Sequence, residues 1–208
     1  MTLDKKDILN SILSSLSRID YIKPEDIPSI PLYMDQVTTF MDTQLKASKR
    51  HEEDKILTKT MINNYAKNDL IPPPLKKKYS KEHLLLLIFV YYFKSIMSIS
   101  DIQTLLGPIT EKFFDTDAKL DLSSIYEEVF SLEKSQVEYM AKDIIRRYNI
   151  AGKTFEKADE KDQEFLHQFS FICMLSFDVY VKKQIIEKMV DELQEKVQPD
   201  TSKDKQKK

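Results

Sequence analysis

The sequence predicts an almost entirely helical protein, and two observations point to that class. The 208 residues contain only two glycines, Gly107 and Gly152, too few for the tight turns that the hairpins of a β-rich fold need. Apolar residues also recur at the three- and four-residue spacing of amphipathic helices along most of the chain. We therefore predict an all-α protein, long enough for one domain or two small ones.

Composition excludes several classes of function. Cys173 is the single cysteine, so neither an internal disulfide nor a thiolate metal cluster can form, and a reducing cytoplasm is the expected compartment. The longest apolar run, residues 84–93, is far shorter than a bilayer span. The sequence has no glycine-rich phosphate loop, no His-x-x-x-His pattern and no nucleophile with an evident partner histidine. We expect a cytoplasmic protein that is not an enzyme and uses no cofactor or metal.

The net charge of −2 conceals an uneven distribution. Residues 46–94 hold 11 basic and 5 acidic side chains, whereas residues 109–200 hold 13 basic and 20 acidic ones. A basic stretch is often only solvated surface. This one contains the run Lys76-Lys77-Lys78 next to a candidate DNA-binding helix, which favours contact with phosphates.

Four segments precede that helix. Apolar residues at helical spacing predict a helix over residues 3–19 with a structural role. Three prolines make residues 21–31 an irregular strap, and residues 33–45 are again predicted to be an amphipathic helix. The charged segment 46–56 permits two interpretations: its basic residues reach phosphates, or it is a mobile loop in which acidic residues cancel them.

The segment after Thr58 predicts a short helix with one polar and one apolar face. Thr58 is a suitable N-cap, Met61, Ile62 and Tyr65 fall on the inner face, and the prolines at 72–74 forbid continuation. The outward residues are Lys59, Thr60, Asn63, Asn64 and Lys67. Lysines pair with phosphates, and an asparagine amide can bond N6 and N7 of adenine together. We predict that this helix reads bases in the major groove of DNA.

The same stretch resembles the winged helix-turn-helix of the MerR family of bacterial transcription regulators. Residues 61–65 match the family's Thr-Leu-Arg-x-Tyr, and residues 69–71 with Pro73 match its Gly-Leu-Ile and proline. Residues 79–84 then resemble its Tyr-Ser-x-x-His/Asp-Leu, and residues 99–106 its Phe-Ser-Leu-x-x-Ile-x-x-Leu-Leu. The chain resembles in particular an uncharacterised MerR-like family of Gram-positive bacteria with an all-helical C-terminal half.

The sequence departs from the MerR pattern at three places, one of which is an insertion between the first two helices. The usual arginine and first tyrosine of the recognition helix are Asn63 and Asn64 here. The segment 74–78 is too short for a full hairpin with a glycine tip, although Lys77 stands at the usual wing arginine. The resemblance therefore implies a winged helix-turn-helix with a short wing.

The resemblance implies a sequence-specific transcription regulator that binds double-stranded DNA as a homodimer. Its expected regions are an N-terminal helix (1–20), the DNA-binding domain (21–108), a helical dimerisation or sensing region (109–197) and a disordered basic tail (198–208). The expected DNA-binding residues are Thr58, Lys59, Thr60, Asn63, Asn64, Tyr65, Lys67, Lys76, Lys77, Lys78 and Tyr79. The alternative is a protein-interaction adaptor that keeps the winged-helix scaffold.

The remaining segments are predicted to be helical. Residues 81–96 are apolar on every side over most of their length, which predicts a helix at the centre of the core. Ser100 and Gln103 are expected to cap the next helix, which Gly107-Pro108 would end. Further helices are expected over 109–117, over 121–148 with a break near Ser131, and over 159–197, with a loop at 149–154.

Aromatic residues gather in the last of these helices. Phe165, Phe169, Phe171, Phe177 and Tyr180 could line a pocket for a small apolar effector, or simply belong to a core or dimer interface. Cys173, between apolar neighbours, is expected to be a buried and inert thiol.

Overall fold

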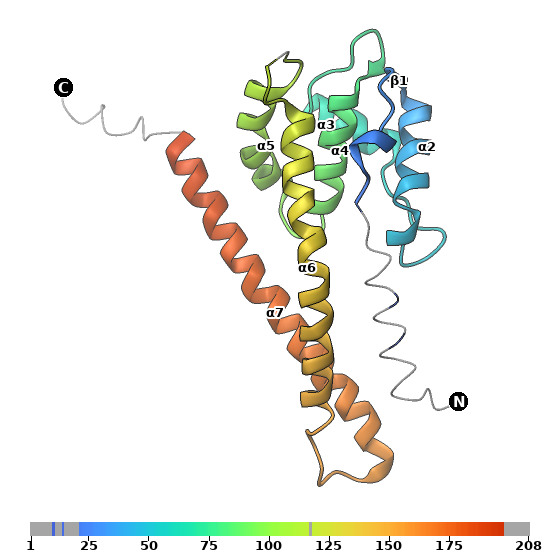
Figure 1. The fold of residues 1–208 in the computed structure, drawn as a ribbon, viewed down its shortest axis with the longest axis vertical. Helices are drawn as coiled ribbons and strands as arrows, with labels where there is room; N and C mark the ends of the chain where they lie inside the picture. The colour runs from blue at the N-terminus through green and yellow to red at the C-terminus, as the bar shows by residue number, and fades with distance from the viewer. Residues whose placement is uncertain (1–9, 11–13, 15–20, 117, 198–208) are drawn as a thin grey trace, which may run out of the picture. The chain divides into compact units, whose positions relative to one another are not determined.

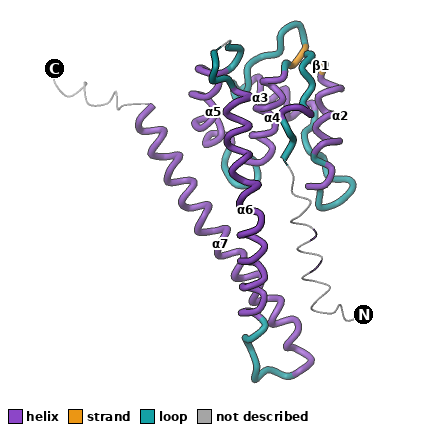
Figure 2. Tube along the Cα trace, in the orientation of Figure 1, coloured by secondary structure: helices purple, strands orange, loops and turns teal. Residues whose placement is uncertain are grey.

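The structure, a computed structural model, describes residues 10, 14, 21–116 and 118–197. Over these residues the chain is mostly helical, and its strands form one two-stranded sheet, as Figure 2 shows. The all-α prediction is confirmed at this level. The expected N-terminal helix falls largely outside the described residues, and the expected disordered tail lies wholly outside them.

The chain divides into two compact units, each of which is described by itself. The core unit comprises Ile22–Glu127 and the described residues from Lys183 onward. The hairpin unit comprises Glu128–Lys182 and the described residues up to Tyr21.

The core unit carries short strands between its helices (Figure 1). Its elements in chain order are η1 (Pro24–Asp26), β1 (Leu32–Tyr33), α2 (Met34–Gln44), η2 (Lys46–Ser48), α3 (Lys59–Lys67), β2 (Lys78–Tyr79), α4 (Lys81–Phe93) and α5 (Ile99–Phe113). Helix α6 (Leu122–Ala151) begins in this unit, and α7 (Glu160–Val197) ends in it.

Helix α4 is the centre of the core unit. Every residue from His83 to Val90 is buried, so α4 has no solvent-facing side over these two turns. Apolar residues of the surrounding helices complete the core: Val37 and Met41 of α2, Ile62 and Tyr65 of α3, Ile102 and Leu106 of α5, and Leu122 and Tyr126 of α6. The prediction of a central apolar helix is confirmed over 84–90, whereas residues 91–93 are only half-buried and the helix ends at Phe93 rather than at residue 96.

Helix α5 differs from its prediction at both ends. Its N-cap is Ser98, whose hydroxyl accepts from the Asp101 N–H at 3.1 Å while the Asp101 carboxylate accepts from the Ser98 N–H at 3.0 Å. The helix then continues through Pro108 to Phe113, so the expected end at Gly107-Pro108 and the separate helix after it are wrong. Because Pro108 lies on the exposed side, water can solvate the backbone carbonyl that the proline leaves without a partner.

The hairpin unit consists of most of α6, a loop and the first part of α7. The break or cap expected near Ser131 is absent, since α6 continues through this residue, whose hydroxyl donates to the Glu128 carbonyl within the helix at 2.8 Å. Helix α6 also runs on to Ala151, into the segment expected to be a loop. Arg147 joins the two helices: its guanidinium bonds Asp143 of α6 at 2.5 Å and Asp178 of α7 at 3.3 Å.

Aromatic residues of α7 lie mostly on the surface of this unit. Phe171 is buried against Tyr148, with ring centroids 5.3 Å apart. The other four aromatic residues singled out in the sequence are exposed: Phe165, Phe169, Phe177 and Tyr180. Cys173 is exposed as well, so the prediction of a buried thiol is wrong. Among the described residues no helix is long and apolar enough to cross a membrane.

Helix α3 ends in a backbone conformation that its sequence does not favour. Asp69, just past the C-cap Asn68, has a φ of 54°, and the Leu70 N–H donates back to the Tyr65 carbonyl at 2.9 Å. This geometry is the left-handed helix cap that glycine normally occupies, because a Cβ is unfavourable there. An aspartate also places a negative charge at the negative end of the helix dipole.

Replacing Asp69 with glycine should stabilise the protein by about 1 kcal/mol, which raises the melting temperature by about 2–4 °C for a chain of this size. Asp69→Ala is the matched control, because it removes the charge but keeps the Cβ in the left-handed region. We expect the alanine variant to melt no higher than the wild type in thermal circular dichroism. Equal gains from both substitutions would show that charge, rather than backbone strain, limits this cap.

Candidate nucleic-acid interface

Helix α3 presents a polar face to solvent. Thr58 caps its start, with the side-chain oxygen accepting from the Met61 N–H at 3.2 Å. Ile62 and Tyr65 are buried against the core, whereas five residues on the opposite side are exposed: Lys59, Thr60, Asn63, Asn64 and Lys67. The division of the helix into inner and outer faces is confirmed for these residues. Met61, predicted on the inner face, is exposed, so that part of the prediction is wrong.

A tight turn of lysines precedes strand β2. The Lys78 N–H donates to the Leu75 carbonyl at 2.9 Å, and the two central residues, Lys76 and Lys77, have φ values of 50° and 64°. Positive φ at both central positions is the signature of a type I′ turn, which usually contains asparagine and glycine. We call residues 75–78 the lysine turn. It projects the Lys76 and Lys77 side chains into solvent.

The lysine turn and the start of α3 meet at the same end of α2. Strand β1 pairs antiparallel with β2, with Tyr33 opposite Lys78, and continues directly into α2. The Lys78 ammonium lies 5.0 Å from the centre of the Tyr33 ring. Lys59 at the start of α3 forms an ion pair with Asp35 in the first turn of α2. The exposed face of α3 and the lysine turn therefore belong to one surface of the core unit.

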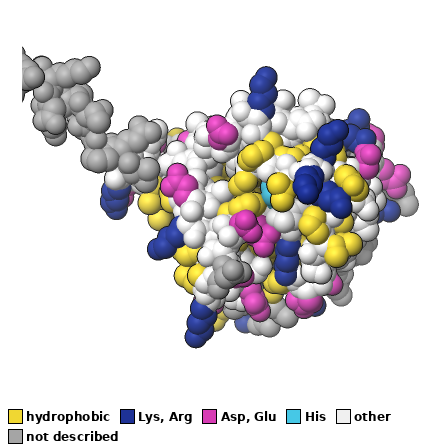
Figure 3. Space-filling model, turned by 90° about the horizontal axis from the view of Figure 1, so that it is seen from above, with side chains coloured by type: hydrophobic (Ala, Val, Ile, Leu, Met, Phe, Trp, Pro, Cys, Tyr) yellow, Lys and Arg dark blue, Asp and Glu magenta, His cyan; other side chains and the backbone are white. Residues whose placement is uncertain are grey.

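Several lysines lie on this surface. Figure 3, which views the molecule from above Figure 1, shows Lys and Arg side chains in dark blue beside hydrophobic ones, with Asp and Glu side chains in magenta among them. Lys67, Lys76 and Lys77 have no carboxylate within ion-pair distance among the described residues. The Lys59–Asp35 pair is largely solvent-exposed, so it contributes little stability and can exchange for another anion.

Two residues predicted for the interface lie in the core instead. Tyr65 is 8% exposed and Tyr79 is 2% exposed. Burial raises the pKa of both phenols. Their rings pack in the core, so the prediction that these two residues belong to the exposed DNA-binding face is wrong.

The family of the chain follows from a match over this same region. Residues 22–129, just over half of the chain, match a family described as Domain of unknown function (DUF1836). The chain belongs to this family. The matched residues nearly coincide with the first segment of the core unit, so the polar face of α3 and the lysine turn both lie inside the DUF1836 domain. No curated protein and no solved structure matches the chain.

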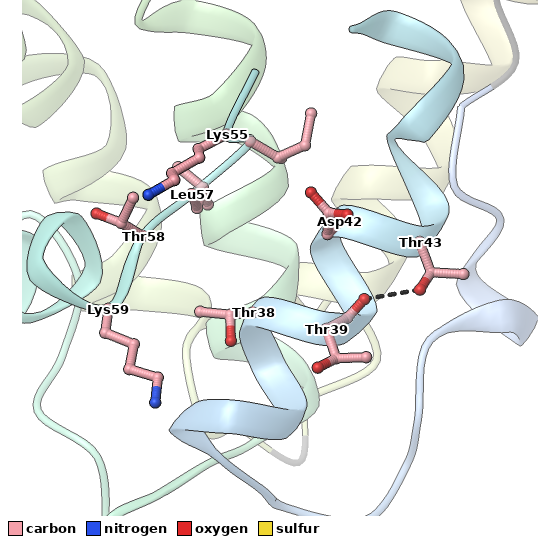
Figure 4. A pocket seen from close by; sticks show the side chains of 9 residues that line it. Thr38, Thr39, Asp42, Thr43, Lys55, Leu57, Thr58 and Lys59 are labelled. Atoms are coloured by element: carbon pink, nitrogen blue, oxygen red, sulfur yellow. Dashed lines mark hydrogen bonds between the residues drawn. The ribbon is translucent and has the colours of Figure 1, made fainter. Parts of the chain in front are cut away.

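A groove runs along α2 beside the start of α3 in the DUF1836 domain. It has a volume of about 400 Å³ and is lined by Thr38, Thr39, Asp42, Thr43, Lys55, Ile56, Leu57, Thr58 and Lys59. Figure 4 shows the residues of α2 on one side and the two lysines on the other.

On its α2 side the groove presents hydrogen-bond acceptors rather than donors. The hydroxyls of Thr38, Thr39 and Thr43 already donate to helix carbonyls at 3.0, 2.9 and 2.8 Å. The Asp42 carboxylate adds a negative charge there and pairs with Lys49 at 2.6 Å. This side is unsuited to a phosphate group, which leaves Lys55 and Lys59 as the cations available to an anion at the groove.

The charged segment after α2 is fastened to α4. The Tyr91 hydroxyl lies 2.5 Å from the Ser48 hydroxyl, and the Lys94 ammonium donates to the Ile56 carbonyl at 2.7 Å. Burial lowers the pKa of Lys94. Because the segment leaves from the C-terminal end of α2, its Lys46 and Arg50 are separated from Asp35 by most of a helix about 16 Å long. They lie away from the start of α3 and the lysine turn, which meet at the other end of α2.

His83 connects the lysine-turn strand to the core of the DUF1836 domain. Its Nδ1 accepts from the Ser80 backbone N–H at 3.0 Å, so the neutral ring carries its proton on Nε2. The ring is buried between Tyr79 and Phe114, with centroids 5.4 and 4.9 Å away. Burial lowers the pKa of His83, against the opposing effects of the Pro73 and Pro72 carbonyls.

This lowered pKa makes stability depend on pH. The unfolded chain, with an ordinary histidine pKa of about 6.5, binds a proton more readily than the folded one. Stability should therefore be complete above the unfolded pKa and be lost as the pH falls from there through the folded pKa. Urea unfolding at a series of pH values from about 8 to 5 measures the loss. In His83→Gln the amide oxygen can still accept from the Ser80 N–H, and we expect the free energy of unfolding to change less with pH. An unchanged dependence on pH would exclude His83 as the cause.

Proposed function

We propose that this protein is a sequence-specific DNA-binding transcription regulator that acts as a dimer. The observation that carries the proposal is the surface formed by α3 and the lysine turn. It combines two exposed asparagines with lysines that have no ion-pair partner in the described part of the chain, on two elements that meet at one end of α2. Amides between cations are suited to a DNA groove, where phosphates flank the base edges.

The resemblance to the MerR winged helix-turn-helix supports the same reading. In that pattern α2 and α3 are the two helices of the motif, and the lysine turn is a wing reduced to two residues. Asp69 stands where the family has glycine and adopts a φ of 54°. Lys77 stands at the usual wing arginine and lies at the centre of the turn.

The exposed residues take distinct roles in this proposal. Asn63 and Asn64 read base edges in the major groove. Phosphates on either side are bound by residues of α3 and of the lysine turn: Lys59, Thr60, Lys67, Lys76, Lys77 and Lys78. Thr58 and the buried Tyr65 and Tyr79 hold the two elements in position.

Dimerisation is assigned to the hairpin unit. Four aromatic side chains of its α7 are exposed: Phe165, Phe169, Phe177 and Tyr180. Large exposed apolar surfaces are rare on soluble monomers and typically mark contact sites. A second copy of the chain would cover them, and a small apolar effector could bind at the same residues.

Selection of bound duplexes from a random DNA pool, followed by sizing of the complex, tests the proposal. We expect enrichment of an inverted repeat and a complex that contains two chains, since two-fold symmetric proteins recognise two-fold symmetric sites. A folded protein that enriches no sequence would overturn it.

The exposed apolar residues of α7 also favour a second candidate, an adaptor that binds a partner protein through its helical half. Retention on DNA resin through a salt gradient separates the two candidates. A DNA-binding regulator elutes at a salt concentration that rises with the number of phosphate contacts, whereas the adaptor is not retained.

Asp35 provides a test of charge at the interface. Asp35→Asn should strengthen binding to all duplexes by about two- to fivefold, because it releases Lys59 and removes a carboxylate that repels phosphates. Fluorescence anisotropy with labelled duplexes measures the change. Asp162→Asn is the matched control, because it removes the same charge at an exposed position in the first turn of α7, within the hairpin unit. Equal effects of both substitutions would contradict the placement of the interface.

A further inference from the structure

Leu75 has an unusual position for a large apolar side chain. It is 77% exposed, more than any other large hydrophobic residue in the described part of the chain. Leu70 and Ile71, just before the prolines, are buried at 3% and 1%. The segment thus buries Leu70 and Ile71 and leaves Leu75 in solvent beside Lys76 and Lys77.

The strand pairing places Leu75 in a defined row. Leu75 bridges to Lys78, and Lys78 pairs with Tyr33 of β1. Residues directly opposite each other in antiparallel pairing project to the same face. Leu75, Lys78 and the half-exposed Tyr33 therefore form a leucine–lysine–tyrosine row, in which the Lys78 ammonium rests on the Tyr33 ring.

We propose that Leu75 is an apolar wedge that enters the minor groove of the bound duplex, partly unstacks a base step and bends the DNA. This inference rests on the proposed function and adds a mechanism to it. Lys76 and Lys77 at the tip of the lysine turn bind the phosphates that border the groove.

The side chains of the leucine–lysine–tyrosine row are suited to the minor groove of DNA. Cations on either side of one leucine complement a groove whose edges are phosphates and whose floor is apolar once a base step opens. The minor groove is only about 6 Å wide, so a single side chain on a narrow turn can enter it where a helix cannot. The left-handed backbone at Lys76 and Lys77 keeps the turn to its minimum of two central residues.

DNA bending tests the wedge directly. The probe is a duplex of about 30 base pairs with a central TA step, which deforms easily, and with a fluorophore at each end. On binding of the full-length wild type, energy transfer between the ends should rise. With Leu75→Ala we expect the rise to disappear while binding weakens by no more than about tenfold, and with Leu75→Met, another wedge residue, we expect it to return. Leu132→Ala, at an exposed leucine of α6 in the hairpin unit, should bend DNA as the wild type does.

Other results would overturn either the wedge alone or the proposed function with it. Wild-type protein that binds the duplex without bending it, or Leu75→Ala that bends it equally, would overturn the wedge and leave the proposed function intact. Absence of any duplex binding would overturn both. Anionic phospholipid vesicles are the second probe: an unbent duplex together with vesicle binding that requires Leu75 would assign the row to a membrane surface instead.

Discussion

Replacing Lys76 with asparagine and Lys77 with glycine will make the protein more stable and its binding to DNA weaker. Both lysines occupy left-handed backbone conformations in a two-residue turn, with φ values of 50° and 64°. Asparagine and glycine are the residues that this turn prefers, so the double variant relieves a strain of about 1–2 kcal/mol. The melting temperature should rise by several degrees, at about 2–4 °C for each kcal/mol.

The same variant removes two phosphate contacts from the proposed interface. We expect affinity for every duplex to fall by about tenfold or more, and the slope of log K against log salt to decrease by about 2. Because stability rises while affinity falls, unfolding cannot explain the loss.

The charge-conserving control is Lys76→Arg with Lys77→Arg. It keeps both the strain and the charges, so stability and affinity should stay close to the wild type. Binding titrations at several salt concentrations measure the affinity and its salt dependence, and a thermal melt measures the stability. Wild-type affinity in the asparagine–glycine variant would remove the lysine turn from the interface.

Asn63→Ala and Asn64→Ala will remove sequence preference while leaving general affinity largely in place. Each amide that bonds an adenine in a bidentate fashion contributes about 1–3 kcal/mol of discrimination, which is roughly 5- to 150-fold. Both side chains are exposed on α3. Alanine also favours helix more than asparagine does, so neither variant should be less stable than the wild type.

Competition between the selected duplex and a scrambled one measures this discrimination. The salt slope should not change, because no cation is lost. Asn149→Ala, the same chemical change on the exposed surface of α6, is the control and should discriminate as the wild type does. Full discrimination in both α3 variants would exclude base reading by this helix.

The elements that were predicted well depend on information local in the sequence. The polar face of α3 and its Thr58 cap follow from residue spacing within three turns of helix. The burial of α4 follows from a run with no polar face, since such a helix can only be surrounded. Both properties are present in a short segment before any other part of the chain is considered.

The positions that were predicted wrongly depend on neighbours far along the chain. The spacing of apolar residues correctly placed Tyr65 on the inner face of α3. The prediction that Tyr65 also contacts DNA is wrong, because the core covers its side chain almost completely. Gly107-Pro108 is a strong local stop signal, yet α5 continues because Ile102 and Leu106 pack in the core while Pro108 faces water. Cys173 has apolar sequence neighbours but lies on the exposed side of α7.

The helical class, the two faces of α3 and the central place of α4 all follow from the order of apolar and polar residues along the chain. The surface shared by the lysine turn and α3 depends instead on long-range contacts, since pairing of β1 with β2 and of Lys59 with Asp35 joins segments more than 20 residues apart. Long-range packing also sets which residues adopt left-handed backbone. Asp69, Lys76 and Lys77 are not glycines, yet each has a positive φ. The packing on either side of each turn imposes this left-handed conformation, which a residue with a Cβ disfavours.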